Sequence, residues 1–147
     1  MATLYFDMDH AIVEHDNIIN ISGGLHGFHD INLLESVLFH VQNDSYYPLL
    51  SDKLTHLVYS IAMNHAFSDG NKRSSIVLGA YFLEINGYGS IVGKFILEME
   101  NVVLWVAQDI INKELLLEIM CNLLEFAEIT EETKLKIFTL FQEHPLE

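Results

Sequence analysis

Ten residues, Asn64 to Arg73, separate two segments of helical periodicity and hold most of the side chains that could support chemistry. In the segment before them, apolar residues recur at every third or fourth position, which predicts a helix over about 54–63. These residues are Leu54, Leu57, Val58, Ile61 and Ala62. The same spacing continues after the stretch to Asn86 and Gly87, where a glycine suits the left-handed position past a helix end. The stretch is therefore predicted to be a loop that joins two helices.

The second of these helices would begin near Asn71 or Lys72, directly after the loop. A helix start leaves its first backbone N–H groups unpaired and carries partial positive charge, which favours an anion. Gly70 lets a phosphate approach the backbone, and Asn71 could both cap the helix and contact phosphate. Lys72 and Arg73 add full charges, and Arg73 is the only arginine of the chain. This pattern predicts a phosphate-binding cradle.

His65 and Asp69 supply the other functions that phosphate chemistry needs. Histidine exchanges a proton near neutral pH, so His65 can act as general base toward a hydroxyl. Asp69 offers hard carboxylate oxygens, which Mg²⁺ takes together with phosphate oxygens and water. Phe67 is expected to anchor the underside of the loop. These parts together predict nucleotide-dependent group transfer, with Lys72 and Arg73 stabilising charge.

A zinc site is an alternative for the same two side chains, because His65 and Asp69 stand at i, i+4. Gly70 would interrupt a helix at that point, however, and no third ligand has suitable spacing. The remaining histidines are expected at the surface or in polar contacts. They are His10, His15, His26, His29, His40, His56 and His144.

Two blocks of the sequence resemble the Fic/Doc family, over about Asp9 to Gly87. The signature block is His65-x-Phe67-x-Asp69-Gly70-Asn71-Lys72-Arg73. Its lysine resembles the Doc (death-on-curing) branch. The second block is Gly23-Gly24-x-x-Gly27-x-x-Asp30-x-x-Leu33-Leu34-Glu35-Ser36. It is similar to the stretch that precedes the signature in Doc-like chains, which usually carry arginine where this chain has His29.

This resemblance implies the toxin of a toxin–antitoxin pair, neutralised by a separate antitoxin protein. It further implies a kinase that uses ATP and Mg²⁺ to phosphorylate a threonine hydroxyl on a component of translation. Elongation factor Tu is the first candidate for this target. Relatives that transfer AMP usually have glycine at the position of Lys72, so the lysine favours a reversed nucleotide with its γ-phosphate beside His65. AMP transfer is the enzymatic alternative. A binding module without activity is the other, suggested only by His29.

The resemblance also raises two questions outside the signature loop. Some Fic proteins inhibit themselves through a helix with Ser/Thr-x-x-x-Glu-Gly/Asn, whose glutamate competes for the signature arginine. Here Thr139-x-x-x-Glu143 is followed by His144, a partial match that leaves self-inhibition open. The region Asn43–Ser51 is expected beside the active site, where a target segment would dock by strand addition, or else as an aromatic loop packed on the core.

The rest of the chain is expected to be helical, which gives a single all-α domain over 1–147 with six or seven helices. Apolar spacing and capping residues predict the further helices. They cover about 7–20 with Asp9 as cap, 30–41 with Asp30 as cap, 95–111, 114–127, and 131–142 with Thr130 as cap.

Composition limits the partners and the compartment. The net charge of −14 disfavours nucleic acid and anionic membranes, which require a basic face. The lone Cys121 cannot form an internal disulfide, so a reducing cytoplasm is the expected location. Residues 1–16 lack the features of an export signal, and no run of about 18 apolar residues predicts a membrane span. The sequence leaves the oligomeric state open, a homo-oligomer included.

Overall fold

The computed structural model describes residues 2–143, which fold into seven α-helices and one short 3₁₀ helix. Their bounds are α1 Met8–Ser22, α2 Ile31–His40, α3 Leu50–Met63, α4 Asn71–Ile85, η1 Gly89–Ile91, α5 Val92–Ala107, α6 Lys113–Phe126 and α7 Glu131–Glu143. Residues 2–143 contain no β-strand, only an isolated antiparallel bridge between Phe28 and Phe67. The all-α class expected from the sequence is confirmed.

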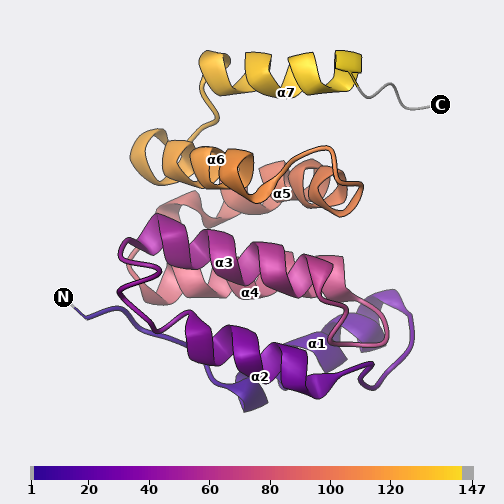
Figure 1. Cartoon of the computed structure of the whole chain (residues 1–147). Helices are drawn as coiled ribbons and strands as arrows, with labels where there is room; N and C mark the ends of the chain where they lie inside the picture. Colours follow the sequence, from indigo (N-terminus) through magenta and orange to yellow (C-terminus); the bar gives the residue numbers. More distant parts are fainter. Residues whose placement is uncertain (1, 144–147) are drawn as a thin grey trace.

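The helices stack in layers around the central pair α3 and α4 (Figure 1). α1 and α2 lie on one side of this pair, α5 and α6 lie on the other, and α7 is outermost. α3 is buried along most of its length, with Leu54, Leu57 and Ile61 among its core residues. The loop between α3 and α4 is therefore held at both ends by the best-packed helices of the fold.

α3, α4 and α5 approach one another closely at Gly79. A Cβ at this position would lie 2.8 Å from Val58 Cγ2 and 2.9 Å from Phe95 Cζ, closer than real Cβ contacts. Glycine is therefore required by packing rather than by an unusual backbone conformation.

Gly79→Ala should accordingly lower the free energy of unfolding by about 1–3 kcal/mol, the usual cost of overpacking a core. Gly93→Ala in α5 is the matched control, because nothing lies within 4 Å of a Cβ at that position. Its stability should stay the same or rise slightly, since alanine restricts the unfolded chain. Urea unfolding measures both variants. Equal midpoints would contradict the close approach at Gly79.

Helix caps agree with the sequence at two positions and differ at one. Asp30 caps α2 and Thr130 precedes α7, where its hydroxyl accepts a backbone N–H, as expected. At α1 the cap is Asp7 and not Asp9: Asp7 Oδ1 accepts a hydrogen bond from the His10 N–H at 2.8 Å, and Asp9 lies in the first turn. The expectation for Asp9 was wrong because both aspartates satisfy the same sequence pattern.

The boundaries of α5 differ from the predicted 95–111. The helix begins at Val92 and ends at Ala107. It ends there because Asp109 adopts a positive φ of 63°, and the N–H of Ile110 turns back to the Trp105 carbonyl at 2.9 Å. The apolar run continues beyond the helix because Ile110 is buried although it is not helical.

The region Asn43–Ser51 is not beside the signature loop. It precedes α3, whereas His65 follows the other end of this 14-residue helix, a distance of about 21 Å at 1.5 Å per residue. Tyr47 stacks on His56 with ring centroids 4.3 Å apart, and the buried Lys53 Nζ donates to Asp44 Oδ1 at 2.7 Å. Target docking beside the active site was therefore wrongly assigned to this region, which is largely exposed and contacts the core only at Tyr47 and at the start of α3.

α7 forms an outer layer that does not reach the signature loop. The Phe141 ring contacts Trp105 at 4.9 Å between centroids, and Thr133 Oγ1 donates to Glu118 Oε2 at 2.7 Å. Figure 1 shows the α5–α6 layer between α7 and the α3–α4 pair. Glu143 ends α7 and forms no ion pair with Arg73, so the structure does not support self-inhibition through Thr139 and Glu143. His144 lies outside the described residues.

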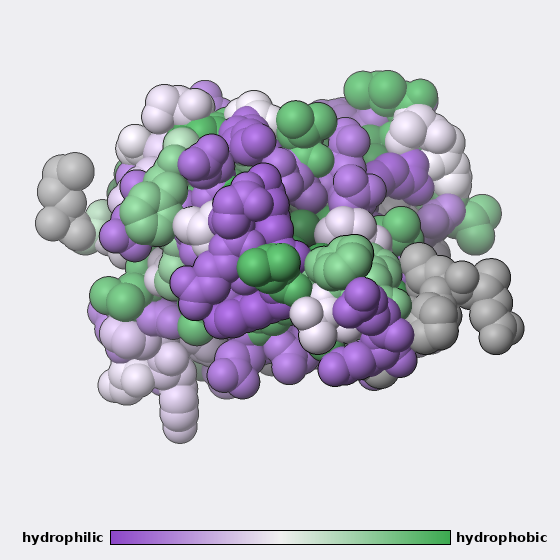
Figure 2. Space-filling model, turned by 90° about the horizontal axis from the view of Figure 1, so that it is seen from above, coloured by the Kyte–Doolittle hydropathy of each residue, from purple (hydrophilic) through white to green (hydrophobic). Residues whose placement is uncertain are grey.

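Hydrophilic side chains run across the face that α7 covers, with hydrophobic residues between them (Figure 2). Leu135 and Phe138 of α7 are both exposed. Among residues 2–143, no helix combines the length and the apolar character that crossing a membrane requires.

Candidate active site

His65 lies immediately past the C-terminal end of α3, in the left-handed region with a φ of 55°. Few residues other than glycine occupy this conformation, and histidine is among those found there more often. The turn leaves the His65 side chain exposed, and its ring has no hydrogen bond to any residue of 2–143. A substrate could therefore reach this ring without first displacing a protein group.

The signature loop pairs with the loop between α1 and α2. The backbone N–H groups of His29 and Asp30 both donate to the Ala66 carbonyl, at 2.9 and 3.0 Å. The Ser68 N–H donates to the Gly27 carbonyl at 3.0 Å. Figure 1 shows these two loops side by side at one end of the α3–α4 pair. The second sequence block, with His29 in place of the usual arginine, therefore lies against the first.

Phe67 fills the space under the signature loop. Its side chain is 1% exposed. The His15 ring of α1 is nearly parallel to it, with centroids 3.8 Å apart and an interplanar angle of 3°, and Phe28 lies 5.4 Å away on centroids. The ring is thus in contact with α1 as well as with the α1–α2 loop.

Asn71 closes the loop from the α4 side. Its Oδ1 accepts a hydrogen bond from the Phe67 N–H at 3.1 Å, and its Nδ2 donates to the Phe67 carbonyl at 3.0 Å. Both polar atoms of this side chain are engaged with the loop backbone. A phosphate contact by Asn71 would therefore use its backbone N–H, whereas its side chain shapes the loop.

Gly70 is required for two reasons. Its φ of 78° lies in the left-handed region, and a Cβ would stand 3.0 Å from Ile19 Cδ1. The side on which that Cβ would lie faces α1, so glycine permits the close approach of α1 and not an opening toward solvent. α4 begins directly afterwards, and its first intrahelical bond runs from the Ser74 N–H to the Gly70 carbonyl. The N–H groups of residues 71–73 precede that bond and are free to meet an anion.

Asp69 is oriented by the backbone on both sides. Its Oδ1 accepts the Gly70 N–H at 2.8 Å and its Oδ2 accepts the Leu25 N–H at 3.2 Å. These backbone hydrogen bonds, together with the charge of Arg73, hold the pKa of the Asp69 carboxyl below its ordinary value. The side chain is 44% exposed, so an ionised carboxylate with unused lone pairs faces solvent beside the start of α4.

Arg73 and Lys72 differ in their surroundings. Arg73 Nη1 donates to the Gly23 carbonyl at 2.9 Å and to Ser22 Oγ, and its Nη2 lies 3.6 Å from Asp69 Oδ1. Lys72 is exposed and has no carboxylate within ion-pair distance among residues 2–143. One cation is therefore fixed at the end of α1, and the other can move to meet a ligand.

Sequence reasoning missed the contribution of α1, above all that of His15. His15 was expected at the surface or in a polar contact, and the polar contact is present, with Nε2 2.7 Å from the Asp69 carbonyl oxygen. That the ring is buried, with 1% exposed, and lies beneath the signature loop was not expected. A signal was present, because Ala11, His15 and Ile19 follow one another at i, i+4 and share one helix face. All three are buried.

The zinc alternative finds no support in this geometry. α3 ends at Met63, so His65 and Asp69 share a loop and not a helix face. Within residues 2–143, no three His, Cys, Asp or Glu side chains converge on a point where they could hold a metal ion. A single carboxylate beside free helix N–H groups would suit Mg²⁺ instead, because Mg²⁺ takes one or two carboxylates together with phosphate oxygens and water.

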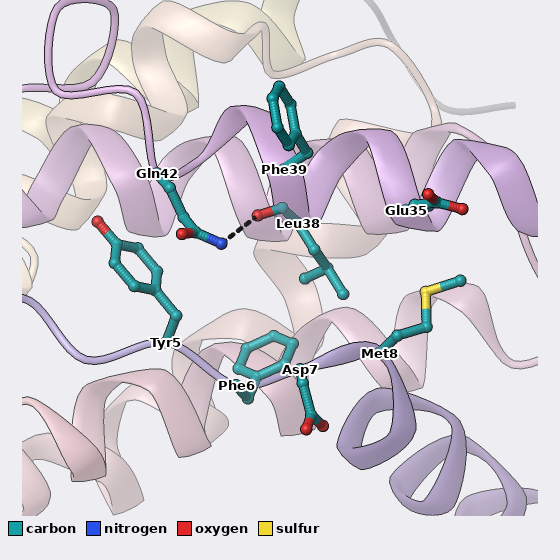
Figure 3. Close-up of a pocket in the computed structure, with 8 residues that line it drawn as sticks. All are labelled: Tyr5, Phe6, Asp7, Met8, Glu35, Leu38, Phe39 and Gln42. Atoms are coloured by element: carbon teal, nitrogen blue, oxygen red, sulfur yellow. Dashed lines mark hydrogen bonds between the residues drawn. The ribbon is translucent and has the colours of Figure 1, made fainter.

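Two hollows of similar size differ in their relation to the loop. The hollow in Figure 3, about 360 Å³, lies between the segment before α1 and α2. It is lined by Tyr5, Phe6, Asp7, Met8, Glu35, Leu38, Phe39 and Gln42. It contains two carboxylates and no Lys or Arg, which disfavours phosphate. The other, about 370 Å³, lies between α1 and α4 and has Arg73 and Ser22 in its wall.

Fold and site together define an all-α protein in which a loop with an exposed histidine joins two central helices and leads into free N–H groups at the start of α4. The Fic/DOC family model matches residues 5–83, more than half of the 147 residues. The chain belongs to the Fic/DOC family. It is also similar to a protein named Toxin Doc from Mycolicibacterium smegmatis, with 41% identity over 69 residues. That similarity covers 44% of this chain and 53% of the relative, so the chain spans about half the length of the relative it matches.

Proposed function

We propose that this protein is a Doc-like toxin of a toxin–antitoxin pair. It acts as an ATP-dependent kinase on a threonine hydroxyl of a translation component, for which elongation factor Tu is the first candidate. The observation that carries the proposal is the arrangement of the signature loop. An exposed histidine stands at its beginning, and a carboxylate, free helix N–H groups and two cations stand at its end. The similarity to Toxin Doc supports the same reading.

The roles follow from where each group lies. His65 takes the proton of the target hydroxyl, because its ring is exposed and unbonded. The backbone N–H groups of residues 71–73 and the Lys72 ammonium receive the phosphates. Arg73, held by the end of α1, stabilises the charge that develops on the transferred group. Phe67 and Asn71 keep the loop in this shape.

The Asp69 carboxylate fits Mg²⁺, because it is ionised, partly exposed and next to the phosphate cradle. A bound Mg²⁺ would neutralise phosphate charge and orient the nucleotide. The protein's own part is to hold the carboxylate in one orientation through the N–H groups of Leu25 and Gly70.

The partners and compartment extend the same proposal. A separate antitoxin protein would neutralise the toxin, and the target would be met in the cytoplasm. The net charge of −14 gives no support to nucleic acid or an anionic membrane as a partner. A binding module without activity remains the rival, because His29 replaces the usual arginine. The backbone of His29 nevertheless keeps the pairing of the two loops, because its N–H donates to the Ala66 carbonyl.

AMP transfer is the second candidate chemistry, and Lys72 decides between the two. Its exposed, unpaired ammonium occupies the position that is usually glycine in AMP-transferring relatives, and this favours the γ-phosphate next to His65. We expect label from γ-labelled ATP, and none from α-labelled ATP, to reach purified elongation factor Tu. Lys72→Gly should lower this transfer, and EDTA should abolish it. Label from the α position in the parent would sink the kinase assignment and favour AMP transfer.

A further inference from the structure

His15 lies beneath the signature loop and takes no part in the chemistry proposed above. Its Nε2 is 2.7 Å from the Asp69 carbonyl oxygen. A carbonyl oxygen can only accept, so Nε2 carries a proton and donates it to this bond. The same ring stacks on Phe67, at 3.8 Å between centroids. His15 therefore holds the loop at two points, once through a polar contact and once through an apolar one.

The polar contact is made at the peptide group that joins Asp69 to Gly70. A peptide group is planar, so fixing the Asp69 carbonyl oxygen also fixes the direction of the Gly70 N–H. That N–H donates to Asp69 Oδ1 at 2.8 Å. The hydrogen bond from His15 thus sets both the orientation of the Asp69 carboxylate and the direction in which α4 begins.

The ring of His15 is held in turn by its own neighbours. Asp16 Oδ1 lies 3.2 Å from His15 Nδ1, and the exposed His26 faces the same oxygen at 3.7 Å. A Cβ at Gly70 would stand 3.5 Å from His15 Nε2, so the ring lies directly against the loop backbone. The ring has little freedom to turn away while Phe67 and Asp16 remain in place.

We infer that His15 is a positioning residue, which orients the Asp69–Gly70 peptide so that the Asp69 carboxylate and the first N–H groups of α4 face one nucleotide. This rests on the proposed function, because it assigns to His15 the geometry of that site. His15 does not contact the substrate. Its effect is carried by geometry, and a displacement of about 1 Å in a reacting group can cost about 10²-fold in rate.

Two substitutions at position 15 separate the polar contact from the apolar one. His15→Phe keeps a ring against Phe67 and removes the donor, whereas His15→Gln keeps an N–H donor and removes the ring. We expect His15→Phe to lower kcat about 10–100-fold with the KM for the protein target unchanged, and His15→Gln to recover part of this loss. A purely packing role requires the opposite order of the two variants, and that result would overturn the inference. His40→Ala, which removes an exposed histidine at the last residue of α2, away from the loop, should behave like the parent.

A measurement without nucleotide separates this inference from the proposed function. Amide hydrogen exchange at Phe67 and Gly70, whose N–H groups are bonded within the loop, should be faster in His15→Phe than in the parent or in His40→Ala. If the parent neither binds Mg·ATP nor transfers phosphate, the proposed function fails while this measurement still decides the role of His15. Unchanged exchange at both amides in His15→Phe would overturn it.

Discussion

Replacing His65 with alanine should lower phosphate transfer by about 10²–10⁴-fold, the usual contribution of a general base. Binding of Mg·ATP should stay near that of the parent, because the carboxylate, the helix N–H groups and Arg73 lie at the other end of the loop. Single-turnover transfer and calorimetry measure the two effects separately. Growth arrest on expression should disappear together with transfer.

His65→Gly is the control that separates chemistry from folding. His65 has a φ of 55°, a conformation that costs glycine less than any residue with a Cβ. The glycine variant should therefore be as stable as the parent or slightly more stable, and the alanine variant no more stable than the parent. Both should lose transfer to the same extent. Undiminished transfer in either one would remove His65 from the mechanism.

The sequence predicted those parts of the site that depend on neighbours along the chain. Residues 65–70 lie in one loop and residues 71–73 form the first turn of α4. The helices on either side follow from their apolar spacing, so a loop with a helix start after it could be expected. The two functions of Asn71 could not be separated in advance. Only the structure shows that both polar atoms of its side chain bond the Phe67 backbone.

The parts that the sequence did not predict are contacts between distant segments. His15 and Asp69 are separated by 54 positions, and no pattern of spacing connects them. The region Asn43–Ser51 and the loop Gly23–His29 both contain aromatic residues and interrupt helices, so composition did not show which of them meets the signature loop. The two segments differ at Gly24, which lets the loop Gly23–His29 approach the signature loop. A Cβ at this position would lie 2.6 Å from Asp69 Oδ2, so only glycine allows that approach.

Phe67→Ala should lower the free energy of unfolding by about 3–5 kcal/mol, the range found when a buried phenylalanine is truncated. The ring is 1% exposed and lies between His15 and Phe28, so its removal leaves a cavity that joins α1, the α1–α2 loop and the signature loop. A loss of this size is a large share of the ~5–15 kcal/mol that stabilises a typical domain.

Phe67→Leu is the matched variant, because it keeps most of the apolar volume and loses only the ring contacts with His15 and Phe28. Urea unfolding should place its midpoint between those of the parent and of Phe67→Ala. Both variants should lose more transfer activity than their loss of folded protein explains. The reason is that Asn71 bonds the loop backbone at Phe67, and this backbone carries His65 two residues earlier. If Phe67→Ala unfolds at the same urea concentration as the parent, the ring does not anchor the loop, and the shape of the site must depend on the Asn71 and His15 hydrogen bonds alone.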